Sequence, residues 1–197
     1  MYSPLVLAVL VVPNGASAAD PQGTPAVGSG LLVDASGEYY YPIHAPRRIH
    51  SAFLNAAIGA EVIRPVHFCA MGGLTFTFAD GNIVQWNDSF QDVRYPTVAA
   101  GLGPMFLLRV RLATLDRVSL AAEMVGAIVL YSGRFPPGGD IYNFAWRFGA
   151  AAGYRLADRL ELSVGVRWMH VSNGQGLGPQ NPSYEAIGFP IALSLAM

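Results

Sequence analysis

A histidine, a serine and a glutamate near the end of the chain carry the side chains that ester hydrolysis requires. His170 is followed two residues later by Ser172, and Glu185 comes thirteen residues after the serine. In serine hydrolases a hydroxyl attacks the ester carbonyl, an imidazole takes the hydroxyl proton, and a carboxylate orients the imidazole. These residue types predict an esterase site, provided that the fold brings the three side chains together.

The composition indicates a membrane β-barrel. Of the 197 residues, 52% are hydrophobic and 13% are charged, about half the charged share that is usual in soluble domains. After the N-terminal segment there is no run of about 18 uninterrupted apolar residues, so we expect strands rather than helices to cross the bilayer. The net charge of −1 argues against nucleic acid as a partner. The single cysteine, Cys69, allows no intrachain disulfide and is expected to be a small, inward-facing side chain.

The first residues resemble a secretory signal peptide. Leu5 to Val12 form an apolar core, and Ala16-Ser17-Ala18 has the small residues of a cleavage site. We therefore expect a signal peptide at 1–18 and a barrel domain at 19–197. The alternative, a short anchor helix, is disfavoured because the apolar run is too short to span a bilayer.

Apolar residues recur at every second position in several segments that are separated by turn residues. We expect strands at about 30–43, 48–63, 66–79, 97–113, 118–132, 141–155, 158–172 and 183–197. Eight strands is the smallest common size for outer-membrane barrels, so the pattern predicts an eight-stranded antiparallel transmembrane β-barrel. Longer connections at 80–96, 133–140 and 173–182 alternate with short turns. Such barrels have short periplasmic turns and longer outer loops, so the longer connections are expected outside.

The same alternation predicts which side chains face lipid, since successive residues of a strand point to opposite faces. In 141–155 the aromatic residues fall on even positions, which must then face lipid. Applied to every strand, this rule directs the following polar side chains inward: Asn55, Glu61, His67, Arg109, Arg111, Glu123, Arg147, Glu161 and Arg167. An eight-stranded barrel has no open pore, so we expect a packed ion-pair network, with a proton or ion path as the alternative. His44 and His50 lie near a loop, and no role is assigned to them.

The candidate site breaks this apolar pattern. Continuing the outward parity from Trp168 makes His170 and Ser172 point toward lipid near the outer rim, and counting back from Ile187 does the same for Glu185. Strands joined by an outer loop are neighbours, so the three side chains should meet on one patch. The Cβ atoms of His170 and Ser172 would be roughly 7 Å apart, which side-chain rotation can close. The alternative is that these residues contact lipid headgroups at the rim.

The segment resembles the PagL-type outer-membrane lipid A deacylases. The resemblance is carried by His170-Val171-Ser172-Asn173, by Asn181-Pro182 and by Glu185. It implies a barrel in the bacterial outer membrane that hydrolyses the ester-linked acyl chain at the 3-position of lipid A, the lipid part of lipopolysaccharide. The resemblance gives Ser172 the role of nucleophile, His170 that of base and Glu185 that of orienting carboxylate. It also makes Asn181 an oxyanion-hole donor, and Asn173 and the backbone N–H of Gly174 are further candidates.

Two other functions fit the same barrel. One is a non-catalytic, OmpX-like surface protein, which would have long outer loops and leave lipid A unchanged. The other is an outer-membrane phospholipase, although no Asp/Glu cluster suggests a calcium site. No cofactor or metal is expected, and the sequence allows a homodimer.

Overall fold

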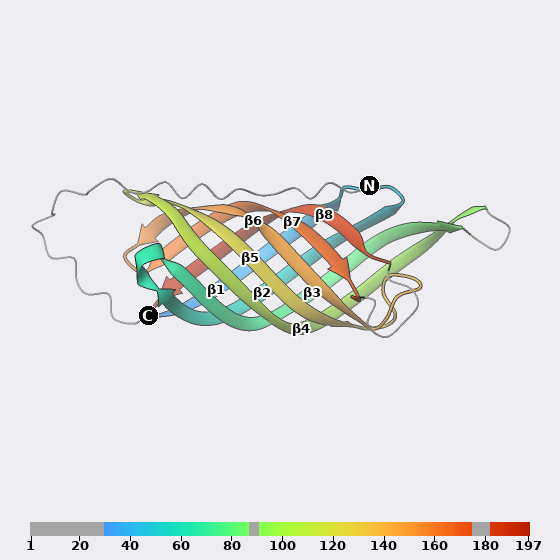
Figure 1. The fold of residues 1–197 in the computed structure, drawn as a ribbon, viewed down its shortest axis with the longest axis horizontal. Helices are drawn as coiled ribbons and strands as arrows, with labels where there is room; N and C mark the ends of the chain where they lie inside the picture. Colours follow the sequence, from blue (N-terminus) through green and yellow to red (C-terminus); the bar gives the residue numbers. More distant parts are fainter. Residues whose placement is uncertain (1–29, 87–90, 175–181) are drawn as a thin grey trace, which may run out of the picture.

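Eight antiparallel strands form a closed barrel in residues 30–86, 91–174 and 182–197, which are the residues described by the computed structural model. Each strand pairs with the next, and the last pairs with the first (Figure 1). The strands are β1 (Leu31–Pro42), β2 (Arg47–Ile63), β3 (Phe68–Trp86), β4 (Asp92–Leu115), β5 (Val118–Tyr131), β6 (Tyr142–Ala157), β7 (Leu160–Ser172) and β8 (Tyr184–Ala196), and a 3-10 helix, η1 (Arg64–Val66), joins β2 to β3. The predicted fold class is confirmed, whereas the predicted signal peptide lies outside the described residues. Within these ranges no helix is long and apolar enough to cross a membrane.

The two ends of the barrel differ in their connections. At one end, called the turn end, β2–β3, β4–β5 and β6–β7 are joined by 64–67, 116–117 and 158–159. β1 begins and β8 ends at this same end. At the other end, called the loop end, the connections are 43–46, 87–91, 132–141 and 173–183. The connections 132–141 and 173–183 are longer than those at the turn end, as predicted, and the β1–β2 connection is the shortest at the loop end.

The prediction of a loop at 80–96 is wrong over most of that segment. β3 continues to Trp86, β4 begins at Asp92, and the two stay in register from Ala79↔Ala99 to Trp86↔Asp92. The hairpin projects beyond the other strands at the loop end (Figure 1). Ile83 of this hairpin still packs in the core at 1% exposure, but the other described side chains from 80 to 96 are partly or fully exposed. Backbone pairing therefore maintains the strands without the apolar alternation on which the prediction relied.

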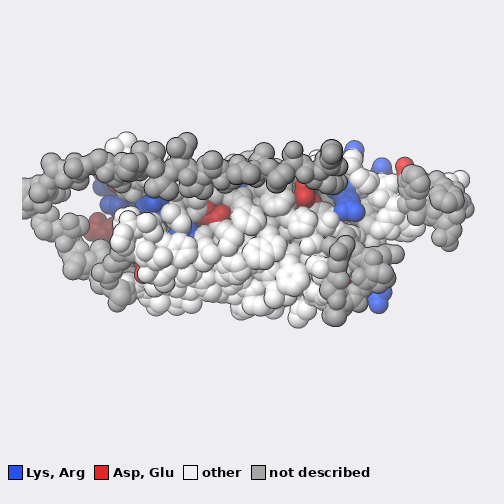
Figure 2. Space-filling model, viewed as in Figure 1, with Lys and Arg blue, Asp and Glu red and all other residues white. Residues whose placement is uncertain are grey.

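Side chains alternate between the outer surface and the lumen as predicted. Outward residues such as Leu54 and Ile191 are 64% and 58% exposed, whereas inward Phe53 and Val125 are each 1% exposed. The face seen in Figure 2 is largely uncharged along its middle, and its charged side chains gather toward the two ends. An apolar band between charged ends is the surface that a bilayer requires of a barrel.

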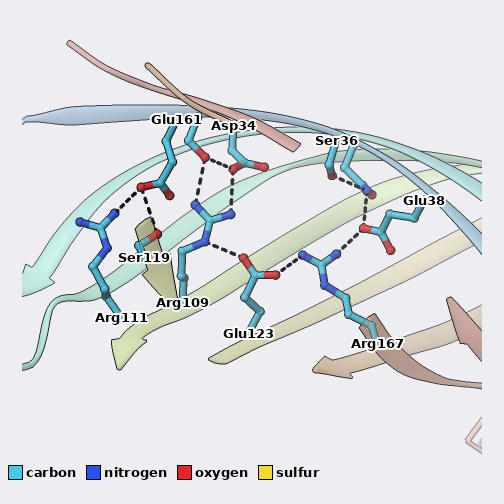
Figure 3. Close-up of polar contacts among 11 residues, drawn as sticks. Asp34, Ser36, Glu38, Arg109, Arg111, Ser119, Glu123, Glu161 and Arg167 are labelled. Atoms are coloured by element: carbon cyan, nitrogen blue, oxygen red, sulfur yellow. Dashed lines mark hydrogen bonds and ion pairs between the residues drawn. The ribbon is translucent and has the colours of Figure 1, made fainter. Parts of the chain in front are cut away.

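Buried ion pairs fill the middle of the lumen (Figure 3). Arg109 Nε lies 2.6 Å from Glu123 Oε1, and its Nη2 lies 3.0 Å from Asp34 Oδ2. Arg167 bridges the other oxygen of Glu123, at 2.6 Å, and Oε1 of Glu38, at 2.5 Å. The predicted ion-pair network is confirmed for these arginines and Glu123, while the carboxylates from β1 were not anticipated.

Further contacts extend the network along the barrel. The fully buried Arg147 lies 3.2 Å from Glu38 Oε2, and its guanidinium lies over the ring of Phe53. Nearer the turn end, Arg111 pairs with Glu161 at 3.2 Å. The lumen is thus occupied by paired charges, as expected of a barrel of this size.

His67 does not lie in the lumen, so that prediction is wrong. It occupies the turn between η1 and β3 with a φ of 47°, and its exposed ring contacts Glu61 at 2.8 Å. The sequence parity failed here because η1 interrupts the strand before residue 67. Cys69 is partly buried and packs against the core, as expected of a small filler.

The connection 132–141 closes the lumen at the loop end. Phe135 is fully buried and stacks on Tyr131 at 4.5 Å, and Tyr184 packs edge-on against it. The Asn143 side chain donates a hydrogen bond to the Phe135 carbonyl at 2.7 Å. Within the described residues, these buried aromatic side chains occupy the mouth of the lumen.

Candidate functional site

His170 on β7 and Glu185 on β8 stand directly opposite each other in the sheet. Both project from the outer wall near the loop end, with side chains 29% and 33% exposed, while their neighbours Met169 and Ala186 are fully buried in the lumen. His170 Nδ1 lies 3.5 Å from Glu185 Oε1. The structure therefore brings these two side chains together, as the alternation predicts.

Ser172 lies two residues beyond His170 on the same face of β7. It pairs in register with Phe144 of β6, and within the described residues no hydrogen bond joins it to His170. Residues two apart on a strand face are about 7 Å apart, and catalytic hydrogen bonds are often long before substrate is bound. Because Nδ1 of His170 faces Glu185, Nε2 is the ring nitrogen that points away from this carboxylate contact.

A ladder of aromatic rings supports the histidine from the turn-end side. The His170 ring stacks on Trp168 with a centroid distance of 5.9 Å and an interplanar angle of 23°. Trp168 in turn stacks on Phe148, and Phe148 on Trp146, at 6.2 and 6.4 Å. The sequence assigned Trp168 to the lipid-facing surface but gave no sign that it restricts the imidazole, since the stack depends on side-chain rotation.

His44 contacts the site, although the sequence gave it no role. Its Nε2 lies 3.1 Å from Glu185 Oε2, so the carboxylate has one imidazole at each oxygen. The β1–β2 turn that carries His44 is tied to the start of β8. Arg47 donates hydrogen bonds to the carbonyl oxygen and the hydroxyl of Ser183, and Ile43 N–H donates to the Glu185 carbonyl at 3.2 Å.

The oxyanion-hole candidates lie at the C-terminal end of β7 and beyond. Asn181 is outside the described residues. Asn173 is 1% exposed, so its side chain is buried away from the outer wall. Gly174 is exposed and has a φ of +70°, a left-handed conformation that glycine adopts without strain. Of the two described candidates, Gly174 is thus the one whose backbone lies at the surface beside Ser172.

A shallow apolar depression continues the outer wall toward the turn end. It has a volume of about 570 Å³ and is lined by Leu120, Ala150, Ala152, Val164, Val166 and Ile191, among others. The small side chains of Ala150 and Ala152 create it between larger neighbours. Val166 is four residues from His170 on the same strand face, a distance of about 13 Å. Among the described residues, no group of three or more His, Cys, Asp or Glu side chains is placed to hold a metal ion.

Comparison with known proteins identifies the family and the fold. The sequence matches the family model described as lipid A 3-O-deacylase (PagL) over residues 70–194. The crystal structure of the outer membrane enzyme PagL superposes with a TM-score of 0.52 at 17% identity, covering 81% of this chain and 97% of that one. Neisserial surface protein A gives a TM-score of 0.47 at 10% identity, covering 84% and 95% of the two chains. No curated protein matches the sequence.

These likenesses differ in what they establish. At 17% identity the superposition on the PagL crystal structure shows the fold alone, that of an outer-membrane β-barrel. The family model reaches further, because it covers more than half of the chain and includes His170, Ser172 and Glu185. The chain therefore belongs to the lipid A 3-O-deacylase (PagL) family of the outer membrane.

Proposed function

We propose that this protein is a serine esterase that removes the ester-linked acyl chain at the 3-position of lipid A, using Ser172, His170 and Glu185. The observation that carries the proposal is the pairing of His170 with Glu185 across β7 and β8 on the outer wall. Polar side chains facing lipid cost up to a few kcal/mol at mid-depth, and less near the interface. His170 and Glu185 are two titratable groups in contact on this surface, and Ser172 lies two residues beyond His170 on the same face. A catalytic role would explain why the chain keeps polar side chains where they are costly.

In the first step Ser172 Oγ attacks the acyl carbonyl carbon while His170 Nε2 takes the hydroxyl proton. The tetrahedral intermediate collapses, the bond to the sugar oxygen breaks, and the proton on His170 passes to that oxygen, which leaves as a sugar hydroxyl. Glu185 stabilises the imidazolium through Nδ1 and keeps it in the required orientation.

In the second step water attacks the acyl-enzyme. His170 removes a proton from the water, and Ser172 recovers its proton when the free fatty acid leaves. The oxyanion of each intermediate requires preorganised N–H donors, and the backbone N–H of Gly174 and the side chain of Asn181 are the proposed sources. The buried side chain of Asn173 is the weaker candidate.

The outer wall is an appropriate place for this reaction. Lipid A is anchored in the outer leaflet, and lateral diffusion would bring its ester to a site at the loop end, which we assign to the cell exterior. The acyl chain being removed would follow the aromatic ladder from Trp168 and end in the apolar depression near Val166 and Ala150. The filled lumen makes the wall the accessible surface for such a substrate.

Expression of the protein followed by mass spectrometry of lipid A tests the proposal. Wild-type protein should produce lipid A lighter by one 3-position acyl chain, and Ser172→Ala should abolish the loss while still forming a barrel. A fluorophosphonate probe should label wild-type protein and not Ser172→Ala. Full deacylation by the Ser172→Ala variant would eliminate Ser172 as the nucleophile.

The projecting β3–β4 hairpin favours a second candidate, a non-catalytic surface barrel. Its strands extend past the rim and offer exposed backbone and side chains to a partner. Unchanged lipid A in cells that carry folded wild-type protein would support this candidate. Release of fatty acid from phospholipid, with lipid A untouched, would instead indicate an outer-membrane phospholipase. The predicted homodimer stays a prediction.

A further inference from the structure

Two outward aromatic side chains of β6 stand beside the candidate site without contacting each other. Phe144 pairs in register with Ser172, and Trp146 pairs in register with His170. Within the described residues, no ring contact joins Trp146 to Phe144 or to His170. The β6 side of the imidazole, which is the side away from Glu185, is therefore bordered by two aromatic rings that lie apart.

Each of these rings lies against a glycine that directs it away from the other. A Cβ placed on Gly126 of β5 would meet the ring of Phe106 and lie 3.1 Å from that of Trp146. Because Gly126 has no side chain, the indole of Trp146 can lie over β5, where it contacts Phe106 of β4 edge-on at 5.8 Å. The Phe144 ring lies toward the loop end, where a Cβ on Gly174 would be 3.3 Å from it. The two glycines thus keep both rings beside the site but separated from each other.

We propose that Trp146 binds the sugar ring that carries the ester, on the side of the site away from Glu185. The inference rests on the proposed function, because it names the residue that holds the leaving group of the same reaction. Trp146 and Ser172 are diagonal neighbours on paired strands. Such residues are about 7–8 Å apart, within reach of an aromatic side chain. A sugar ring held against the indole would therefore lie next to the ester carbon that Ser172 attacks.

The properties of Trp146 suit a sugar better than an acyl chain. Its side chain is 37% exposed, and within the described residues its indole N–H has no hydrogen-bond partner. The N–H can therefore donate to a sugar hydroxyl while the ring covers the C–H groups of the sugar face. Tryptophan is favoured at this kind of boundary, where one part of the ring contacts apolar groups and the other is wet. The acyl chain, in contrast, is assigned to the surface past Trp168, about 7 Å nearer the turn end.

The test compares two esters of the same fatty acid, 2,3-diacylglucosamine 1-phosphate and the methyl ester, which has no sugar. Trp146→Leu in the full-length refolded barrel should lower kcat/KM for the glycolipid about 2- to 12-fold, the effect of losing one aromatic contact. The value for the methyl ester should change less than twofold. Trp146→Tyr keeps a ring and a hydrogen-bond donor, so its kcat/KM for the glycolipid should stay closer to wild type than that of Trp146→Leu. Phe76→Leu is the matched control, because it removes an outward ring from β3, four strands from β7, and should change neither value.

The two esters separate the sugar contact from other roles of Trp146. A loss confined to the glycolipid supports the inference. Equal losses on the two esters would mean that Trp146 only supports His170 through the aromatic ladder, and an unchanged value for the glycolipid would mean that it belongs to the membrane-interface belt. Either result would overturn the inference and leave the esterase intact. Wild-type protein that leaves the glycolipid uncleaved would overturn the proposed function, and this inference with it.

Discussion

The contacts of Glu185 predict effects of different size for replacing Glu185 and for replacing its neighbour His44. Glu185 lies between His170 and His44, with one carboxylate oxygen toward each ring. If Glu185 orients His170, and if His44 acts only by holding Glu185, then replacing Glu185 should impair catalysis more than replacing His44. Replacing both should cost no more than replacing Glu185 alone, because His44 would have nothing left to position.

The magnitudes follow from the geometry. If the 3.5 Å contact between His170 and Glu185 shortens to a hydrogen bond when substrate binds, that bond to a charged group contributes about 1.5–3 kcal/mol, and about 1.4 kcal/mol corresponds to a tenfold change in rate. Glu185→Gln should therefore lower kcat about 10- to 150-fold. The His44 side chain is 64% exposed, and exposed ion pairs contribute about 0.2–1 kcal/mol. His44→Ala should thus lower kcat no more than about fivefold, with KM unchanged.

The assay is the rate of fatty acid release from lipid A in detergent micelles, measured for each single variant and for the double variant. The chain offers a matched control in His67, which pairs with Glu61 at the turn end. The His67 side chain is 61% exposed, against 64% for His44, and each histidine has a glutamate partner that is 33% exposed. His67→Ala should leave kcat unchanged. If His44→Ala impaired kcat as much as Glu185→Gln, or if the two losses multiplied in the double variant, His44 would act directly and the positioning argument would be wrong.

Two further predictions concern the depression and the lumen. Ala150→Trp should fill the apolar depression about 13 Å from His170 and shift the released fatty acids toward shorter chains, as mass spectrometry of the products would show. Glu38→Ala should leave the guanidinium groups of Arg147 and Arg167 without this partner and destabilise the barrel by about 3–5 kcal/mol. The temperature at which the folded band disappears in electrophoresis should fall; an unchanged temperature would show that the network adds little to stability.

Much of the fold could be predicted because each strand has one face toward lipid and one toward a packed lumen. Because of that requirement, apolar residues recur at every second position of a strand. This alternation correctly predicted that Arg109, Arg147 and Arg167 lie inside the barrel. It also predicted that His170 and Glu185 would meet, since a hairpin makes their strands neighbours. These predictions needed no information about side-chain rotation.

The remaining features depend on information that alternation lacks. The contact between His44 and Glu185 joins residues 141 positions apart and exists because β8 closes onto β1. Asp34 and Glu38 were missed because β1 carries tyrosines on both faces: Tyr40 is fully buried, whereas Tyr39 and Tyr41 are exposed. In three consecutive tyrosines, the alternation of outward and inward side chains cannot be recognised from residue type. The full set of contacts at the site therefore depends on the pairing of β8 with β1 and on side-chain rotation, which strand propensity does not predict.

The lumen also determines whether the outer site can exist. A slip of one residue between β7 and β8 would turn either His170 or Glu185 inward, because a strand's side chains alternate. The register is fixed three residues away, where inward-facing Arg167 pairs with Gly188. Arg167 is held by Glu38 and Glu123, and Tyr40 occupies the space beside Gly188, since a Cβ there would lie 2.3 Å from its ring. Paired charges inside the barrel would thus hold two polar side chains opposite each other on its outer wall.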